Sequence, residues 1–367
     1  MNSHFLKDIL RQPEELRRTI ELLIGTTENG AALQATIGKR ALDAATAAIR
    51  GVRRVYLTGI GSSWHAALNV STLFHQHAHP VYLIDADELL RFASFPKDSA
   101  MITISRSGKS AEIVQLARKA RKAGVTVIGI TNAPEGTLAK EAHHAIVVPI
   151  ALDHAISVNT YTTLALATGM LASSVTGSLG SALTASLSHS FAEAGRAIPR
   201  WQEQIANSAW LAPRSTTYFL ARGSSLGSAY ESRLMWEEGV KTPATAIGMG
   251  GFRHGPQEVI AKEMRFGIWI DGAQMREQDL AVARDLRKLG ARVMLIGQKV
   301  AEDAGDLIFQ LPAIQPAWQF LIDIIPAQLV AERLAQMSGV DCDTFRLCSF
   351  VVEEEGGLLP QEKQKGN

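Results

Sequence analysis

A glycine and two serines at positions 61–63 are the first residues of the chain that could bind a ligand. They follow a strand-like run at residues 52–58 and precede a helical pattern, so they are expected in a turn between a strand and a helix. Small residues let the backbone approach a ligand closely, and a helix N-terminus presents N–H groups to an anion. Serine is also a favoured helix cap. By themselves, Ser62 and Ser63 therefore indicate an anion site and a helix cap about equally.

Residues 105–110 are a second serine-rich segment, which follows the mostly apolar run at residues 102–104. The hydroxyl and backbone N–H groups of Ser105, Ser107 and Ser110 could surround one concavity, which suits a phosphate dianion. Neither the P-loop spacing nor the glycine pattern of dinucleotide-binding folds is present, so no nucleotide site is expected. Because a serine-rich turn follows two strands of the same predicted domain, we favour a phosphate site over an ordinary surface turn.

Two glutamates and a histidine in the second half of the chain could carry out acid–base chemistry. Glu237 and Glu238 lie in the last turn of a predicted helix that Gly239 ends. The negative end of the helix dipole would raise the pKa of a carboxyl group there, which favours proton abstraction. His254 lies in a glycine-rich loop that could bring its imidazole to a ligand. A solvated helix end and a loop histidine would look the same, and the serine-rich segments favour the catalytic interpretation.

The elements that must position these residues occur twice along the chain. Each half has a strand followed by Gly-Ser-Ser, a helix that ends in Arg-Lys-x-Gly before an apolar strand, and a further apolar strand that ends in proline. The intervals between the matching glycines and prolines differ by only a few residues, which indicates an internal duplication. Alternating strands and helices predict an α/β protein with mostly parallel sheets, flavodoxin-like and three-layered. The boundary is expected near residue 200, inside an Ala- and Ser-rich helical connector at residues 176–208.

Composition excludes several classes of ligand and location. The chain has 367 residues, 37 Lys and Arg, 36 Asp and Glu, and a net charge of +1. This balance provides no field for nucleic acid or for an acidic membrane surface. We recognise no signal peptide and no stretch long and apolar enough to span a bilayer, and the cysteines are Cys342 and Cys348. We therefore expect a cytoplasmic protein without disulfides.

No metal ion or organic cofactor is expected. Two cysteines cannot form a Cys-rich metal site. His75, His77 and His79 alternate before Pro80 and could chelate a metal on one face of a strand. However, no acidic or cysteine partner accompanies them, and alternate polar residues usually face solvent.

The chain resembles the SIS (sugar isomerase) family along about its whole length. The matching motifs are residues 61–63, residues 105–110 and the Phe-Arg-His-Gly-Pro sequence at residues 252–256. It is most similar to the isomerase half of glucosamine-6-phosphate synthases, to fructosamine-6-phosphate deglycases and to amino-sugar-phosphate deaminases. The resemblance implies two SIS domains, residues 1–200 with an N-terminal helical segment and residues 201–367 with a C-terminal tail. It also implies a homodimer with shared active sites.

The resemblance further implies roles for individual residues. The family's general base is a glutamate sixteen residues before the histidine of the His-Gly-Pro motif, which corresponds to Glu238 and His254. Glu238 would move a proton between C1 and C2 of an open-chain sugar. His254, which in this family can come from the neighbouring subunit, would assist ring opening. The side chains implied in binding the phosphate or the sugar are Ser62, Ser63, Ser105, Arg106, Ser107, Ser110 and Ser157, and the serines at residues 62–63 and 105–110 are those implied for the 6-phosphate.

Departures from the synthase pattern bear on the expected activity. The synthase has a lysine near its C-terminus that engages the open-chain sugar, whereas residues 341–350 contain none, and Met235 stands near the place of a second lysine. The synthase's glutaminase domain needs an N-terminal cysteine, and this chain has no cysteine before Cys342, so no glutaminase activity is expected. Isomerisation, deglycation and deamination stay open, and residues 252–256 favour the deglycase-like branch. The alternative is a non-catalytic phosphosugar sensor, which would have no chemical reason to keep Glu238 and His254.

Overall fold

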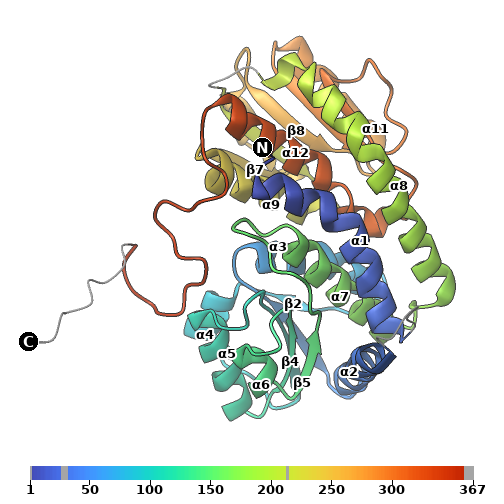
Figure 1. The fold of residues 1–367 in the computed structure, drawn as a ribbon, viewed down its shortest axis with the longest axis vertical. Coiled ribbons are helices and arrows are strands. Elements are labelled where there is room, and N and C mark those ends of the chain that lie inside the picture. Colours follow the sequence, from blue (N-terminus) through green and yellow to red (C-terminus); the bar gives the residue numbers. More distant parts are fainter. Residues whose placement is uncertain (1, 26–31, 212–214, 359–367) are drawn as a thin grey trace, which may run out of the picture.

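The computed structural model describes residues 2–25, 32–211 and 215–358, and its two halves are each built on a five-stranded sheet (Figure 1). The first sheet has the order β2-β1-β3-β4-β5, and all its strand pairs are parallel. All residues of its central strand are buried, as expected for a parallel sheet that is covered on both faces. Its strands are β1 (Arg54–Thr58), β2 (Tyr82–Leu83), β3 (Ser99–Ile104), β4 (Thr126–Thr131) and β5 (His144–Val147). Its helices are α2 (Ala32–Arg50), α3 (Ser62–His75), α4 (Ala86–Phe92), α5 (Ala111–Lys122), α6 (Thr137–Glu141) and α7 (Asn159–Thr176).

The second sheet repeats this strand order. Read from its β7 edge it is β7-β6-β8-β9-β10, again with parallel pairs only. Both sheets thus have the 2-1-3-4-5 order of flavodoxin-like folds, and the predicted parallel α/β architecture is confirmed. The strands are β6 (Thr217–Ala221), β7 (Ala244–Gly248), β8 (Arg265–Trp269), β9 (Arg292–Gly297) and β10 (Leu307–Gln310). The helices are α9 (Leu226–Met235), α10 (Met249–Phe252), α11 (Arg276–Lys288) and α12 (Ile324–Met337). Shorter turns are η1 (Ala209–Leu211), η2 (Gly223–Ser225), η4 (Pro256–Val259), η5 (Pro316–Leu321) and the π-helical turn η3 (Trp236–Val240).

Two long helices, α1 (His4–Ile24) and α8 (Ser181–Ala206), join the halves (Figure 1). The predicted connector forms α8, and residue 200 lies inside this continuous helix. Helix α1 packs against α7 of the first half and against α8 and α12. One apolar cluster contains Leu57 and Ile104 of the first sheet, Phe219 and Trp269 of the second, and Leu16 of α1. The halves therefore share a continuous core, which fixes their relative position.

The three alternating histidines do not lie on a strand, contrary to the geometry considered from the sequence. His75 ends α3, and His77 and His79 lie in the turn that follows, because the next strand starts only at Tyr82. His77 Nδ1 lies 2.9 Å from the carbonyl oxygen of Leu73. Within the described part of the chain, no three His, Cys, Asp or Glu side chains are arranged to hold a metal ion. The helices described here include none that is long and apolar enough to cross a membrane.

Candidate active site

The two serine-rich segments lie at the same end of the first sheet, where its strands finish. We call residues 61–63 the serine turn and residues 105–110 the serine loop. Strands β1 and β3 are parallel neighbours in which Thr58 pairs with Thr103, so the segments that follow them leave from the same edge. This edge is the carboxyl end of the sheet, where open parallel sheets bind their ligands. The structure thus brings together the segments that the sequence analysis selected.

Two glycines shape the serine turn. Gly61 has a φ angle of 56°, which L-residues rarely adopt, and a Cβ atom on Gly59 would lie 2.6 Å from the carbonyl carbon of Ser63. Gly61 is the N-cap of α3, and no side chain caps the helix there. Ser62 Oγ instead donates a 2.9 Å hydrogen bond to Oε1 of Glu231 in the second half. The capping interpretation of these serines is therefore wrong.

The serine loop is held in shape by its own hydroxyl groups. Ser105 Oγ accepts the backbone N–H of Gly108, and Ser107 Oγ accepts that of Lys109, each at 3.1 Å. Gly108 has a φ angle of 60°, which turns the chain back towards the sheet. Ser110 is the N-cap of α5, and its side chain makes no capping hydrogen bond. The loop therefore has a defined conformation next to the N-terminus of a twelve-residue helix.

Arg106 connects the serine loop to two other segments. Its Nη1 donates to Ser157 Oγ at 3.0 Å and to the carbonyl oxygen of Ala155 at 3.2 Å. Its Nη2 donates to the carbonyl oxygen of Phe350 at 2.5 Å, and its Cζ lies 4.1 Å from the centre of the Phe350 ring. Burial lowers the pKa of Arg106 from its usual value. The guanidinium group provides a positive charge beside the hydroxyl groups of the serine loop.

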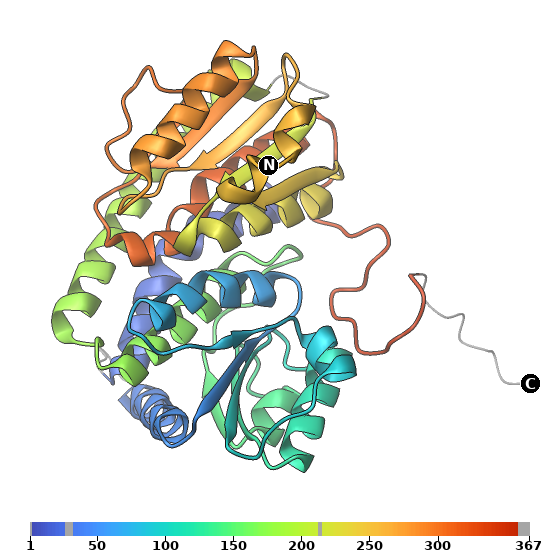
Figure 2. The same ribbon diagram turned by 180° about the vertical axis from the view of Figure 1, so that it is seen from behind.

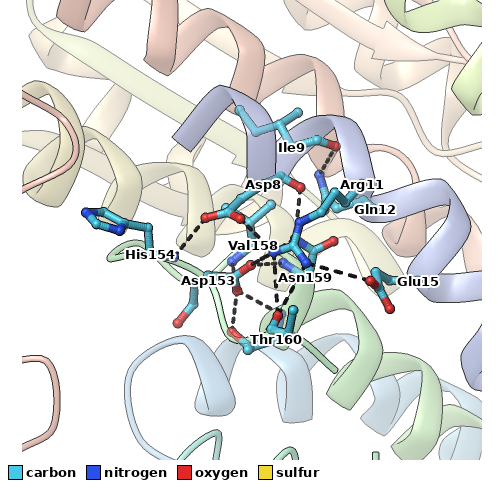
Figure 3. A network of polar contacts seen from close by, with 12 residues as sticks. Asp8, Ile9, Arg11, Gln12, Glu15, Asp153, His154, Val158, Asn159 and Thr160 are labelled. Atoms are coloured by element: carbon cyan, nitrogen blue, oxygen red, sulfur yellow. Dashed lines mark hydrogen bonds and ion pairs between the residues drawn. The ribbon is translucent and has the colours of Figure 1, made fainter. Parts of the chain in front are cut away.

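The segment that carries Ser157 is anchored to α1 by a polar network (Figure 3). The carboxylate of Asp153 accepts hydrogen bonds from the backbone N–H groups of residues 158–160 and from Oγ1 of Thr160. Asp8 of α1 accepts the backbone N–H of His154 at 2.9 Å. These contacts hold the loop before α7 in place, and with it the partner of Arg106.

Glu238 lies in the π-helical turn η3 that extends α9. The prediction that Gly239 ends this helix is wrong, because the turn continues to Val240 and Lys241, with a φ angle of 58°, follows as its C-cap. A Cβ atom at Gly239 would lie 2.9 Å from Cδ1 of Ile156, so a larger residue there would have to displace the end of that side chain.

Electrostatics give Glu238 the properties of a base. Burial raises the pKa of Glu238 to about 7, and the negative charge of Glu231 acts in the same direction, while Arg106 and Lys241 oppose the shift. The expected rise is present, but burial is its first cause rather than the helix dipole. A carboxyl group with a pKa near neutrality suits proton transfer at carbon.

Three residues near Glu238 were not selected from the sequence. Glu231 lies two helical turns before Glu238, and it contacts His65 of α3, which packs against α9. The spacing of Glu231 and Glu238 was the only signal in the sequence, because it puts both on one helix face. Lys241 Nζ donates to the carbonyl oxygens of Glu238 and, at 2.8 Å, of Thr344. A lysine therefore lies beside the candidate base even though Met235 stands near the expected lysine position.

A C-terminal segment, residues 341–358, crosses from the second half to the first (Figures 1 and 2). The backbone N–H of Ala111, the first residue of α5, donates to the carbonyl oxygen of Val352 at 3.0 Å. Glu355 forms an ion pair with Arg91 of α4. Together with the contact between Phe350 and Arg106, these bonds place the segment across the serine loop.

His254 lies away from Glu238 within one chain. Glu238 precedes the amino end of strand β7 and His254 follows its carboxyl end, and the five strand residues between them span about 17 Å. His254 leaves from the carboxyl edge of the second sheet, and its side chain is exposed. The chain therefore does not bring these two residues into one site by itself.

The corresponding segments of the second half are occupied by the protein's own carboxylates. Asp323 is buried and accepts the hydroxyl groups of Ser225, in the turn that follows β6, and of Ser228, at the start of α9, at 2.6 and 2.7 Å. After β8, the carboxylate of Asp271 accepts the backbone N–H groups of residues 273–275. Negative charges at these positions disfavour an anionic ligand. In the first half a carboxylate, Glu231, also reaches the serine turn through Ser62, but the serine loop carries the positive charge of Arg106, so the first half is the better candidate site.

Residues 48–174 match the family described as the SIS domain. This range contains the serine turn, the serine loop and Ser157. The chain is thus similar to the SIS-domain family over these residues.

Relatives that match nearly the whole chain share one name. The glutamine–fructose-6-phosphate aminotransferase (isomerizing) of Symbiobacterium thermophilum is 27% identical over 358 residues, which are 94% of this chain and 58% of the relative. The protein of the same name from Pyrobaculum aerophilum is 24% identical over 371 residues, with 96% and 58% covered. The chain thus spans little more than half the length of these relatives.

Solved structures share the fold over nearly the whole chain. The C-terminal domain of glucosamine-fructose-6-phosphate aminotransferase from Francisella tularensis has a TM-score of 0.80 at 21% identity and covers 94% of this chain and 98% of that one. Glucosamine-6-phosphate deaminase from Thermotoga maritima has a TM-score of 0.76 at 23% identity, with 95% and 99% covered. At these identities the likeness shows the α/β fold with its two parallel sheets.

Proposed function

We propose that this protein is an enzyme that binds an open-chain amino or glycated sugar 6-phosphate and moves a proton of the sugar with Glu238. The observation that carries the proposal is a half-buried carboxyl group with a pKa of about 7, within electrostatic reach of Arg106 in the serine loop. The names of the relatives, which include fructose 6-phosphate and glucosamine 6-phosphate, support the substrate class. We propose the first-half serines and Arg106 as the phosphate and sugar ligands.

The proposed reaction needs one base and no metal ion or organic cofactor. Glu238 removes a proton from the carbon next to the carbonyl or imine group, and the C–H electron pair forms the double bond of an enediol or enolamine. Return of the proton to the neighbouring carbon completes an isomerisation. If the shifted double bond is an imine, water adds to it and the amine or ammonia leaves, which is deglycation or deamination. The site supports all three outcomes, and the substrate decides among them.

A solvent-exchange assay tests the function. Thermal shift with glucosamine 6-phosphate and fructose 6-phosphate would first show whether either sugar binds. NMR would then follow incorporation of solvent deuterium at C1 or C2 of the bound sugar. We expect both binding and exchange. Binding without exchange or turnover would contradict catalysis and support a phosphosugar sensor.

The activity should depend on pH through Glu238. As the base, this residue must be ionised, and its pKa is raised to about 7. We therefore expect kcat/KM for exchange to rise as the pH increases through about 7 and to level off above it. The measurement is the exchange rate between pH 5 and 9. A rise centred near the ordinary glutamate pKa of about 4.5 would contradict the assignment.

We also propose that the active form is a homodimer whose sites are shared between subunits. The glycine-rich sequence predicted as a loop forms the short helix α10, and the exposed His254 that follows it lies at a surface that a neighbouring subunit with C2 symmetry would cover. Mixing inactive Glu238→Gln and His254→Ala variants under subunit exchange should restore activity. A mixed dimer would then hold one site with both residues intact. If mixed dimers form and stay inactive, the shared site is wrong.

The proposal also covers the origin of the two halves, the location of the protein and its lack of glutaminase activity. The shared 2-1-3-4-5 strand order supports an origin of the two halves by duplication. Cys342 and Cys348 are free thiols, which fits the cytoplasm. Burial raises the pKa of Cys342 to about 11 and also raises that of Cys348, so neither is an activated nucleophile. We therefore propose that this chain does not hydrolyse glutamine.

A further inference from the structure

The C-terminal segment occupies two anion-binding groups at the serine loop. Arg106 Nη2 donates to the carbonyl oxygen of Phe350 at 2.5 Å, and the Phe350 ring lies 4.1 Å from Cζ of Arg106. The backbone N–H of Ala111, at the N-terminus of α5, donates to the carbonyl oxygen of Val352 at 3.0 Å. Guanidinium groups and helix N-termini are typical protein ligands of phosphate. Carbonyl oxygens of the chain itself therefore lie where phosphate oxygens are expected.

Before it reaches the serine loop, the segment passes the candidate base. Lys241 Nζ donates to the carbonyl oxygen of Thr344 at 2.8 Å, and the same lysine follows the turn that carries Glu238. Burial raises the pKa of the Cys348 thiol, and the charges of Glu238 and Arg106 also act on it. Cys348 thus lies within electrostatic reach of both the base and the guanidinium group, and the segment extends from one to the other.

The far end of the segment is held by contacts that are individually weak. Glu355 forms an ion pair with Arg91 of α4 and accepts Nε2 of Gln115 in α5 at 3.0 Å. The side chains of the pair are 38% and 34% exposed, and exposed ion pairs contribute little to stability. Residues 352–358 are all exposed. A segment held in this way can be displaced by a ligand that binds the same groups better.

The segment and a phosphate group cannot use these donors at the same time. The N–H of Ala111 makes its hydrogen bond with Val352, and the Phe350 ring covers the guanidinium group of Arg106. With phosphate, the N–H of Ala111 would exchange a neutral acceptor for a charged one, which gives a hydrogen bond about twice as strong. Phosphate should therefore displace the segment, but its apparent affinity is reduced to the extent that the segment is bound.

We propose that residues 345–355 are autoinhibitory: in the ligand-free protein Phe350 and Val352 occupy the anion-binding groups of the serine loop, and a phosphosugar binds after this segment has left. The inference rests on the proposed function for the position of the phosphate, and it does not depend on catalysis. It predicts that weakening a contact of the segment strengthens phosphosugar binding. A segment that closes over the bound sugar would show the opposite.

Two single variants of the full chain test this prediction by calorimetry with fructose 6-phosphate. Phe350→Ala removes the ring from Arg106, and Glu355→Lys replaces the ion pair with Arg91 by a repulsion. The size of an exposed contact of either kind corresponds to an affinity gain of about two- to fivefold. The double variant should bind about 4- to 25-fold more tightly than the wild type, because the gains from separate contacts multiply.

Two control variants separate these contacts from general effects. Glu353→Lys makes the same change of charge at an exposed position two residues before the ion pair. Leu347→Ala shortens an apolar side chain of the same segment that is 66% exposed. We expect Leu347→Ala to bind like the wild type. Glu355→Lys should bind more tightly than Glu353→Lys by the full effect of the contact, about two- to fivefold.

A fluorine label shows directly whether the ligand displaces the segment. With 4-fluorophenylalanine at position 350, 19F NMR reports the contact between this ring and Arg106. Saturation with fructose 6-phosphate should move the resonance towards its position in urea-unfolded protein, because the ring leaves the guanidinium group.

Unchanged or weaker binding in both Phe350→Ala and Glu355→Lys would overturn the inference. A fluorine resonance that stays in place at saturation would overturn it as well. If fructose 6-phosphate binds as expected but no solvent exchange is seen, the catalytic proposal fails and the inference stands. If neither the wild type nor any variant binds fructose 6-phosphate, the phosphate site is wrong and both fail.

Discussion

Replacing Glu238 by glutamine should lower the rate of solvent exchange and turnover by about 10²–10⁴-fold on every phosphosugar that the protein binds. Glutamine has nearly the same shape as glutamate, but its amide cannot accept a proton from carbon. Because the side chain is half-buried in a helical turn, the fold and the affinity for the phosphate group should change little. The measurements are single-turnover exchange and binding by calorimetry.

Glu237 provides a matched control in the same turn. Its carboxylate pairs with Arg233 at 3.0 Å. Glu237→Gln removes a neighbouring charge of the same sign without touching the candidate base, so turnover should stay within a few-fold of the wild type. Near wild-type turnover of Glu238→Gln, or an equal loss in Glu237→Gln, would contradict the role of Glu238 as the base.

Combined replacement of Ser105 and Ser107 by alanine should be the second large effect. Each lost hydrogen bond to a charged group costs about 1.5–3 kcal/mol, so affinity for a phosphosugar should fall by about 10²–10⁴-fold. The structure adds a second reason, since these hydroxyl groups also accept the N–H groups of Gly108 and Lys109 and so shape the loop. Calorimetry with fructose 6-phosphate measures the loss, and the melting temperature checks the fold.

A control serine tests whether the loss of affinity is specific to the serine loop, and a control ligand tests whether the loop binds the phosphate group. Ser71→Ala, in the middle of α3, removes a hydroxyl group that bonds only within its own helix, to the carbonyl oxygen of Leu68. Its affinity for fructose 6-phosphate should stay at the wild-type value. Wild-type protein should bind unphosphorylated fructose far more weakly. Equal affinities for fructose and its 6-phosphate would show that the loop does not bind phosphate.

The sequence alone was sufficient for the architecture and for the local turns. Short apolar runs that alternate with helical periods specify strands and helices, and their order along the chain specifies a parallel sheet. The repeated landmarks predicted the second sheet, and the serine loop was recognisable because its chemistry lies in consecutive residues. The predicted end of the helix at Gly239 was wrong. The turn continues past this glycine to Val240, and Gly239 instead lies close to the side chain of Ile156.

Tertiary structure decided everything that depends on contacts between distant segments. The pairing of His65 with Glu231, the bond from Arg106 to Phe350, and the separation of His254 from Glu238 follow from the packing of two halves, and no spacing in the sequence encodes them. Burial, which is the first cause of the raised pKa of Glu238, is likewise a property of the packed chain. Pattern and spacing describe neighbours along the backbone, whereas the charge and proton affinity of a side chain depend on its neighbours in space.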